Sequence, residues 1–218
     1  MRGLERFAPL TGIGFVLLVI VAVIVGGETP DSNDGIVKVV NYWKDNQDQA
    51  VASAIIAAFS AVFLVWFAGV WRAVLAAVEG PPARLANTAF GGALIGATGW
   101  LLLIGFTFVA ADTADDVAPQ VTQTLSVLQA DFFFPLAVGF AVFLLASGLA
   151  VVRTAALPSW LGWSALVIGV LGVTPAGFFA ILAMLVWIAV VSVMLFLATS
   201  AAPPPAQTTL PTGGPGQL

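Results

Sequence analysis

Carboxylates are the side chains of this sequence whose positions best suit chemistry. Asp112, Asp115 and Asp116 lie close together, and Asp131 stands directly before a long apolar segment. The first three suggest a divalent-cation cluster, but a calcium site needs about six to eight oxygen ligands, and no EF-hand spacing accompanies these residues. We therefore expect a solvated acidic loop at this point of the chain rather than a metal site.

Asp131 has two interpretations. It precedes three phenylalanines and Pro135 at the start of an apolar segment. A carboxylate at the edge of a membrane span can face a cavity and contact a proton or a cation. It can also cap the helix, with its charge against the helix dipole and Pro135 in the first turn. The capping interpretation requires no function, and we favour it.

Histidine and cysteine are both absent from the sequence. Their absence excludes Ser-His-Asp triads, HExxH zinc sites, disulfides and thiolate chemistry. No apolar segment contains a lysine or a run of arginines, which excludes a retinal Schiff base and a voltage sensor. We therefore expect no catalytic residue, no metal site and no cofactor, and we expect that the protein is not an enzyme.

The composition predicts a membrane protein. Hydrophobic residues make up 60% of the 218 residues and charged residues only 8%, whereas soluble domains carry about 25% charged residues. In a membrane this apolar surface faces lipid instead of water. No segment is basic enough to bind nucleic acid, so the expected partners are membrane lipids and other membrane protein subunits.

The apolar segments predict an all-α, polytopic membrane helix bundle with six transmembrane helices in one domain over residues 1–200. The spans are expected at about 9–27, 50–71, 85–111, 131–152, 159–173 and 176–199. The fifth is at the lower limit of spanning length, so a re-entrant or kinked segment is its alternative. Residues 201–218, rich in proline and glycine, are expected to form a flexible cytoplasmic tail.

Two connections on the outer side are expected to form short amphipathic helices. In the first, Asp34 is the expected N-cap, and Tyr42 is expected at headgroup depth together with Trp43. The apolar residues recur at helical spacing in both connections: Ile36, Val39, Val40 and Trp43 in the first, and Val117, Val121, Leu125 and Leu128 in the second. The two helices form either a lid over an outward-facing cavity or a structural cap, and we favour the cap.

The basic residues predict the orientation of the six spans. With the N-terminus in the cytoplasm, all arginines fall on the cytoplasmic side and both lysines on the outer side. Because cytoplasmic loops carry the excess of basic residues, we expect both termini in the cytoplasm. Arg72, Arg84 and Arg153 would then form a rim that contacts anionic lipid headgroups.

The third predicted span contains a GxxxG motif. Gly92 and Gly96 stand four residues apart and allow two helix backbones to approach closely in lipid. The motif suits packing within one bundle or pairing of two copies of the chain. We favour packing within the bundle.

One short motif resembles a known family. Arg153-Thr154-Ala155-Ala156-Leu157-Pro158-Ser159-Trp160-Leu161-Gly162-Trp163 resembles the linker into the fifth span of uncharacterised, actinobacterial-type membrane proteins with about six helices and an LPxWLGW-like motif. The resemblance implies a six-helix architecture in the bacterial inner membrane. The family has no assigned activity, so the resemblance implies no site.

Two functions remain as expectations. The first is a non-enzymatic accessory or assembly subunit of a membrane complex, suggested by the glycine-rich packing surfaces and the few polar residues in the spans. The alternative is a binder or transporter of a hydrophobic or lipidic small molecule, because an apolar bundle suits apolar cargo.

Overall fold

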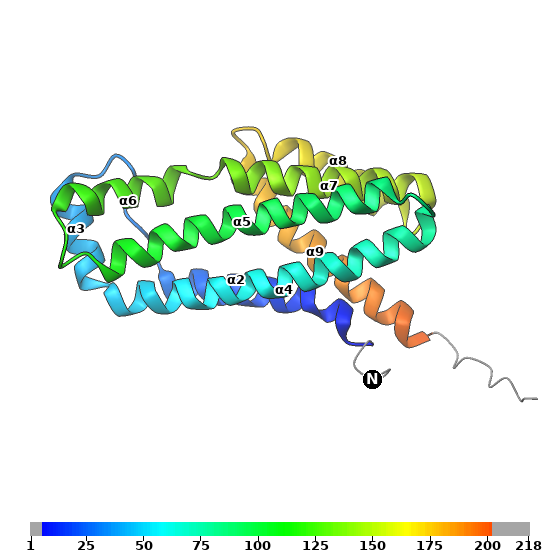
Figure 1. The fold of residues 1–218 in the computed structure, drawn as a ribbon, viewed down its shortest axis with the longest axis horizontal. Helices are drawn as coiled ribbons and strands as arrows, with labels where there is room; N and C mark the ends of the chain where they lie inside the picture. Colours follow the sequence, from blue (N-terminus) through cyan, green and yellow to red (C-terminus); the bar gives the residue numbers. More distant parts are fainter. Residues whose placement is uncertain (1–5, 202–218) are drawn as a thin grey trace, which may run out of the picture.

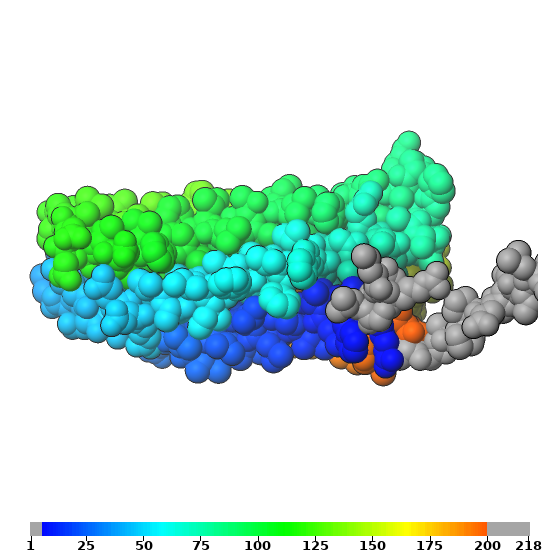
Figure 2. Space-filling model, turned by 60° about the horizontal axis from the view of Figure 1, so that its bottom comes forward, coloured from blue at the N-terminus to red at the C-terminus, as the bar shows by residue number. Residues whose placement is uncertain are grey.

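The protein is a bundle of helices that run mostly along one long axis (Figure 1). The computed structural model describes residues 6–201, and the predicted all-α membrane bundle is confirmed in this part of the chain. Arg2 and the tail predicted after Ala201 lie outside the described residues. Figure 2 shows α2, α4 and α5 side by side along the molecule.

The helices follow the apolar segments of the sequence. In chain order they are a single 3-10 turn η1 (Ala8–Leu10), α2 (Thr11–Gly26), α3 (Ile36–Asp45), α4 (Gln47–Glu79), α5 (Arg84–Asp112), α6 (Pro119–Asp131), α7 (Phe134–Thr154), α8 (Ser159–Leu171) and α9 (Gly177–Ala201). Five helical segments in the described part of the chain are long and apolar enough to cross a membrane: Ala8–Gly26, Gln47–Glu79, Arg84–Asp112, Pro119–Thr154 and Gly177–Thr199. The protein is thus a multi-pass integral membrane protein.

The fifth predicted span, α8, is shorter than the others. Its 13 residues extend about 20 Å at 1.5 Å per residue, which is less than the roughly 30 Å hydrocarbon core of a bilayer. A sharp turn follows α8, and α9 then runs back toward the end of the bundle at which α8 begins (Figure 1). The pair α8–α9 therefore forms a hairpin with one short and one long arm.

Two helices are longer than a bilayer is thick. The 33 residues of α4 extend about 50 Å, and the 29 residues of α5 about 44 Å. Both exceed the roughly 30 Å hydrocarbon core, and α3 and α6 pack on this pair at the end opposite the α4–α5 connection (Figure 1). Trp43 of α3 is fully buried there among alanines of α4 and α5. These contacts make α3 and α6 a packed cap on the end of the bundle.

The two ends of the bundle differ in charge. We call the arginine end the one with the chain start, the α4–α5 connection and the α7–α8 connection (Figure 1). It holds the four arginines of the described residues: Arg6, Arg72, Arg84 and Arg153. The other end, the acidic end, holds α3, α6 and their loops, with carboxylates and both lysines. The predicted segregation of charge along the bundle is present, and the orientation in the cell stays a prediction.

Glycines set the closest helix contact of the bundle, between α5 and α7. A Cβ atom on Gly92 would lie 2.4 Å from the Phe143 backbone nitrogen, and one on Gly139 would lie 2.1 Å from the Gly96 nitrogen. No side chain fits at these distances, so the two backbones touch directly. This is the close approach that small residues allow in lipid. Gly92 and Gly96 thus pack within the chain, against α7.

The end of α2 shows how the acidic end satisfies backbone groups. The last carbonyls of a helix lack partners within it, which is costly near hydrocarbon. At this end Tyr42 Oη donates to the Gly26 carbonyl (3.3 Å), Gln49 Nε2 to Val25 (2.6 Å) and Ser53 Oγ to Ala22 (2.8 Å). Burial raises the pKa of the Tyr42 phenol above its usual value. These bonds tie α2 to α3 and α4.

A strained position ends α7. Ala155, the exposed C-cap residue, has φ +52° and ψ +30°, in the left-handed region that suits glycine. We expect Ala155→Gly to stabilise the protein by about 0.5–1 kcal/mol, because the relieved strain exceeds the added freedom of the unfolded chain. Thermal unfolding in detergent would measure the change.

A second alanine provides the control for Ala155. Ala77 is equally exposed but lies within α4. Ala77→Gly should destabilise by about 1 kcal/mol, as glycine does in helix interiors. If both variants lost stability alike, Ala155 would have helical geometry instead.

Candidate functional site

Two interruptions of helical structure lie beside each other near the middle of the bundle. The first separates α6 from α7 at Phe132 and Phe133. The second is the turn between α8 and α9, where the Thr174 hydroxyl donates to the Leu171 carbonyl (2.7 Å) and accepts from the Ala176 amide (3.2 Å). Residues from both interruptions line one cavity.

This cavity, which we call the junction cavity, has a volume of about 320 Å³. Ligand pockets in proteins span about 300–1,000 Å³, so the junction cavity has room for part of a small molecule. Its lining comes from α6, α7, α9 and the α8–α9 turn: Ala130, Phe133, Ala137, Gly172, Thr174, Pro175, Gly177, Phe178 and Ile181. Thr174 supplies the one polar side chain of this lining, so the cavity suits an apolar ligand.

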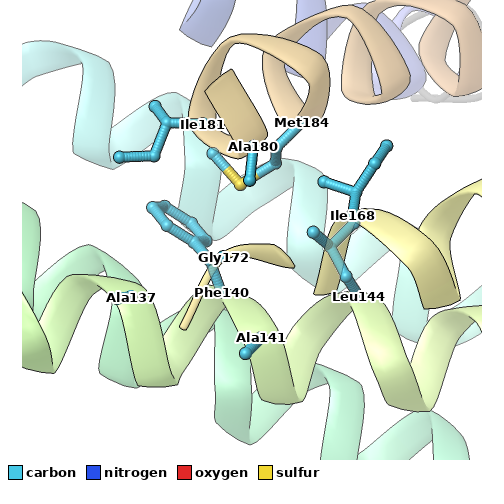
Figure 3. A pocket seen from close by; sticks show the side chains of 9 residues that line it. All are labelled: Ala137, Phe140, Ala141, Leu144, Ile168, Gly172, Ala180, Ile181 and Met184. Carbon is cyan, nitrogen blue, oxygen red and sulfur yellow. The ribbon is translucent and has the colours of Figure 1, made fainter. Parts of the chain in front are cut away.

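Two smaller apolar cavities share lining residues with the junction cavity. One of about 10 Å³ lies between α7, α8 and α9 and shares Ala137, Gly172 and Ile181 with the junction cavity. Figure 3 shows Phe140 and Met184 pointing into this gap from α7 and α9. A third cavity of about 60 Å³ shares Phe140, Ile181 and Met184 with the 10 Å³ cavity, and its lining also includes Phe15 and Trp100. The three cavities form one apolar series from the junction into the core.

The gap exists because α8 packs tightly on α7 while α9 does not. Gly148 and Gly162 bring the backbones of α7 and α8 together, since a Cβ on Gly148 would lie 2.7 Å from the Gly162 carbonyl oxygen. The long helix α9 packs mainly on α2 and α8. Between α7 and α9 the lining residues Ala137, Ala141 and Ala180 are small, and they leave space unfilled.

Trp187 anchors α9 to its neighbours just after the residues of α9 that line the gap. Its Nε1 donates to the Leu161 carbonyl of α8 (2.9 Å). Its ring meets the edges of Trp71 and Phe143, with ring centroids 5.9 Å apart in each pair. Trp71 in turn donates through Nε1 to Ser147 Oγ (2.9 Å). These contacts hold α9 against α4, α7 and α8 at Trp187. The part of α9 that precedes Trp187 lines the cavities.

Exposed phenylalanines surround the mouth of the junction cavity. We call the phenylalanine rim the set Phe132, Phe133, Phe134, Phe178 and Phe179, all of them exposed. Phe133 stacks on Phe134 with centroids 5.0 Å apart, and Phe178 meets the edge of Phe179 at 5.7 Å. Phe133 and Phe178 also line the cavity itself. The mouth therefore presents aromatic faces to the membrane.

Asp131 lies beside this mouth, but not in either expected role. It is the last residue of α6 and is exposed, so it is no buried carboxylate. The N-cap of α7 is Phe133, without a side-chain hydrogen bond, so the prediction of a capping aspartate is wrong. The cause is the two-residue break, which starts α7 at Phe134 rather than at Asp131. Asp131 directly follows Ala130, which lines the junction cavity.

Two predictions for the cap at the acidic end are also wrong in detail. The N-cap of α3 is Gly35, while Asp34 pairs with Lys38 (2.7 Å), whose hydrogen bond lowers the pKa of the Asp34 carboxyl. In α6 the fully buried residues are Thr122 and Ser126; of the predicted stripe Val121 is exposed, while Leu125 packs on the small core around Trp43. The packed face of α6 therefore combines Leu125 with two polar residues.

The position of Trp43 corrects a third expectation. The sequence places it at headgroup depth, yet it is 0% exposed and belongs to a small core with Val39 and alanines of α4 and α5. The α3 pattern therefore faces protein rather than lipid. α3 contributes no residue to the lining of the junction cavity, and α6 contributes only Ala130.

The expected arginine rim lies at the opposite end. Arg72 Nε donates to Asn87 Oδ1 (2.8 Å), and the guanidinium lies 5.8 Å from the Phe90 ring centroid, which links α4 to α5. Arg84 and Arg153 are exposed. Their contact with anionic headgroups stays a prediction.

The fold and the cavity define a class: a multi-pass helical membrane protein with an apolar cavity series inside the bundle. Comparisons with protein-family models, with curated proteins and with solved structures found no match for this chain. The resemblance carried by the motif around Pro158 therefore stays a prediction. The candidate site rests on the geometry of the chain itself.

Proposed function

We propose that this integral membrane protein is not an enzyme and that it binds a hydrophobic or lipidic molecule in the junction cavity. The observation that carries the proposal is the cavity series between α7 and α9, lined almost wholly by apolar side chains. An apolar chain entering from the membrane would replace empty space with dispersion contacts. Apart from the Thr174 hydroxyl, which is bonded to Leu171 and Ala176, the lining has no group suited to acid-base or nucleophilic chemistry, so binding rather than catalysis fits it best.

The architecture gives such a molecule a route from the bilayer. The phenylalanine rim is exposed on the surface of membrane helices, and Phe133 and Phe178 continue into the cavity lining. A chain could therefore pass sideways between the α6–α7 break and the α8–α9 turn. Because both of these segments lack regular helical bonding, they have more freedom to adjust than the helices beside them.

A second candidate, an accessory subunit of a membrane complex, is favoured by a groove on the other side of the bundle. The groove of about 610 Å³ lies between α4 and α5 and includes Ala58, Ala61 and Ala97. Trp66, which also lines the groove, is 64% exposed. A groove with small residues can accept a helix of a partner protein at close range.

Native mass spectrometry of the full chain, extracted gently from its own membrane, separates the two candidates. Lipid binding predicts one lipid-sized mass that survives activation after loosely bound lipids have dissociated. A stoichiometric protein partner would support the accessory-subunit function instead. A bare chain under all conditions would contradict both.

A further inference from the structure

The charges around the junction cavity indicate which headgroup its ligand carries. Lysines are the only basic residues at the acidic end within the described residues, and both are paired. Lys38 contacts Asp34 at 2.7 Å, and Lys44 contacts Asp115 at 2.9 Å. The remaining carboxylates there have no lysine partner of their own: Glu28, Asp31, Asp45, Asp48, Asp112, Asp116 and Asp131. The field at this end is therefore negative.

Asp131 is the one of these carboxylates that directly follows a residue of the cavity lining. It is exposed and lies in the sequence between Ala130, which lines the cavity, and Phe132 of the phenylalanine rim. A carboxylate attracts a cation, and exposed aromatic faces attract ammonium groups through their ring quadrupoles. The same carboxylate disfavours headgroups that carry a net negative charge. Together these groups make a mouth suited to an ammonium group above an apolar cavity.

We propose that the junction cavity binds a lipidic molecule whose headgroup carries an ammonium group and no net negative charge. The apolar chain lies along Ala137, Phe140 and Ile181, and the ammonium group lies between Asp131 and the phenylalanine rim. This inference rests on the proposed function and adds the headgroup to it.

The test is a competition between two lipids with identical chains. The full-length protein is placed in nanodiscs of equal parts dioleoylphosphatidylcholine and dioleoylphosphatidylglycerol, extracted, and analysed for the tightly retained lipid by native mass spectrometry. We expect the phosphatidylcholine to be retained over the phosphatidylglycerol by about fivefold. Asp131→Asn should bring this ratio close to one while the thermal stability stays unchanged, because Asp131 is exposed.

Asp45→Asn is the matched control, because Asp45 is an exposed carboxylate of the same end that does not line the junction cavity. It should leave most of the preference intact. Equal retention of both lipids, preference for phosphatidylglycerol, or no effect of Asp131→Asn would overturn the headgroup inference while leaving the proposed function standing. Failure to retain either lipid would overturn the proposed function and the headgroup inference with it.

Discussion

Gly139→Ala is expected to destabilise the bundle strongly, although it adds a single methyl group. The added Cβ would lie 2.1 Å from the Gly96 nitrogen and 2.5 Å from its Cα. Both atoms belong to the backbone of α5 and cannot rotate away, so α5 and α7 must separate along their contact. We expect a loss of about 3 kcal/mol, visible as a lower midpoint of thermal unfolding in detergent.

Gly91 offers a matched control on α5, one residue from the same seam. A Cβ on Gly91 meets nothing within 4 Å, so Gly91→Ala gains helix propensity without a clash. It should stabilise the protein by up to about 1 kcal/mol. If Gly139→Ala and Gly91→Ala had the same unfolding midpoint, the direct backbone contact between α5 and α7 would be disproved.

Ala137→Leu is expected to abolish retention of the lipid-sized ligand. Ala137 is 6% exposed and lines both the junction cavity and the small cavity beside it. The larger side chain would occupy the space in which we place the ligand chain, and part of the gap between α7 and α9 would be filled. Native mass spectrometry should show the bare chain as the main species, with retained lipid reduced about tenfold or more.

Two further variants separate filling of the cavity from damage to the fold. Ala130→Trp narrows the mouth from an exposed position, so it should lower retention without a change in unfolding temperature. Ala73→Leu makes the same change as Ala137→Leu on an exposed position of α4, outside the cavity lining. It should retain the ligand like the unchanged protein. Undiminished retention in both Ala137→Leu and Ala130→Trp would contradict the assigned cavity.

Hydrophobicity alone was enough to predict the helices and their order. The apolar runs correspond to α2, α4, α5, α7, α8 and α9, because burial of backbone groups in lipid forces such runs into helices. Hydrophobicity did not predict how far the helices continue beyond the apolar runs. The helix α4 exceeds its predicted span at both ends: Gln47 and Asp48 continue it into the packed cap, and it runs on to Glu79 at the arginine end.

Details that depend on tertiary contacts could not be predicted from one sequence. The packed face of α6 includes Thr122 and Ser126 beside Leu125, whereas periodicity also favoured Val121, which is exposed. Local signals before Pro135 suggested that Asp131 caps a helix, yet the chain breaks at Phe132 and Phe133. A capping residue marks the start of a helix only where it immediately precedes the first helical residue.

The candidate site was the least predictable feature. The cavity lies where α7 and α9 are not packed on each other, beside the Trp187 contacts and the glycine contact between α7 and α8. The sequence did contain related signals: the Thr174-Pro175 turn, the small residues around it, and the phenylalanine runs at 132–134 and 178–179. Their meeting at one mouth required the fold.

Photo-crosslinking tests the central claim, an apolar chain inside the bundle, most directly. The full-length protein would be reconstituted with dioleoylphosphatidylcholine that contains a fraction of an analogue with a diazirine on one acyl chain. After illumination, the labelled residues would be mapped by mass spectrometry. Met184 and Phe140 are informative because they are only 2% and 6% exposed. Val186, on the same helix as Met184, is 64% exposed and reports the surrounding bilayer.

We expect label on Met184 and Phe140 in addition to Val186, and loss of the first two labels in Ala137→Leu. Such a pattern requires the acyl chain to enter between α7 and α9. Label on Val186 and other exposed residues alone would show that lipid only surrounds the bundle, and the proposed binding function would be wrong.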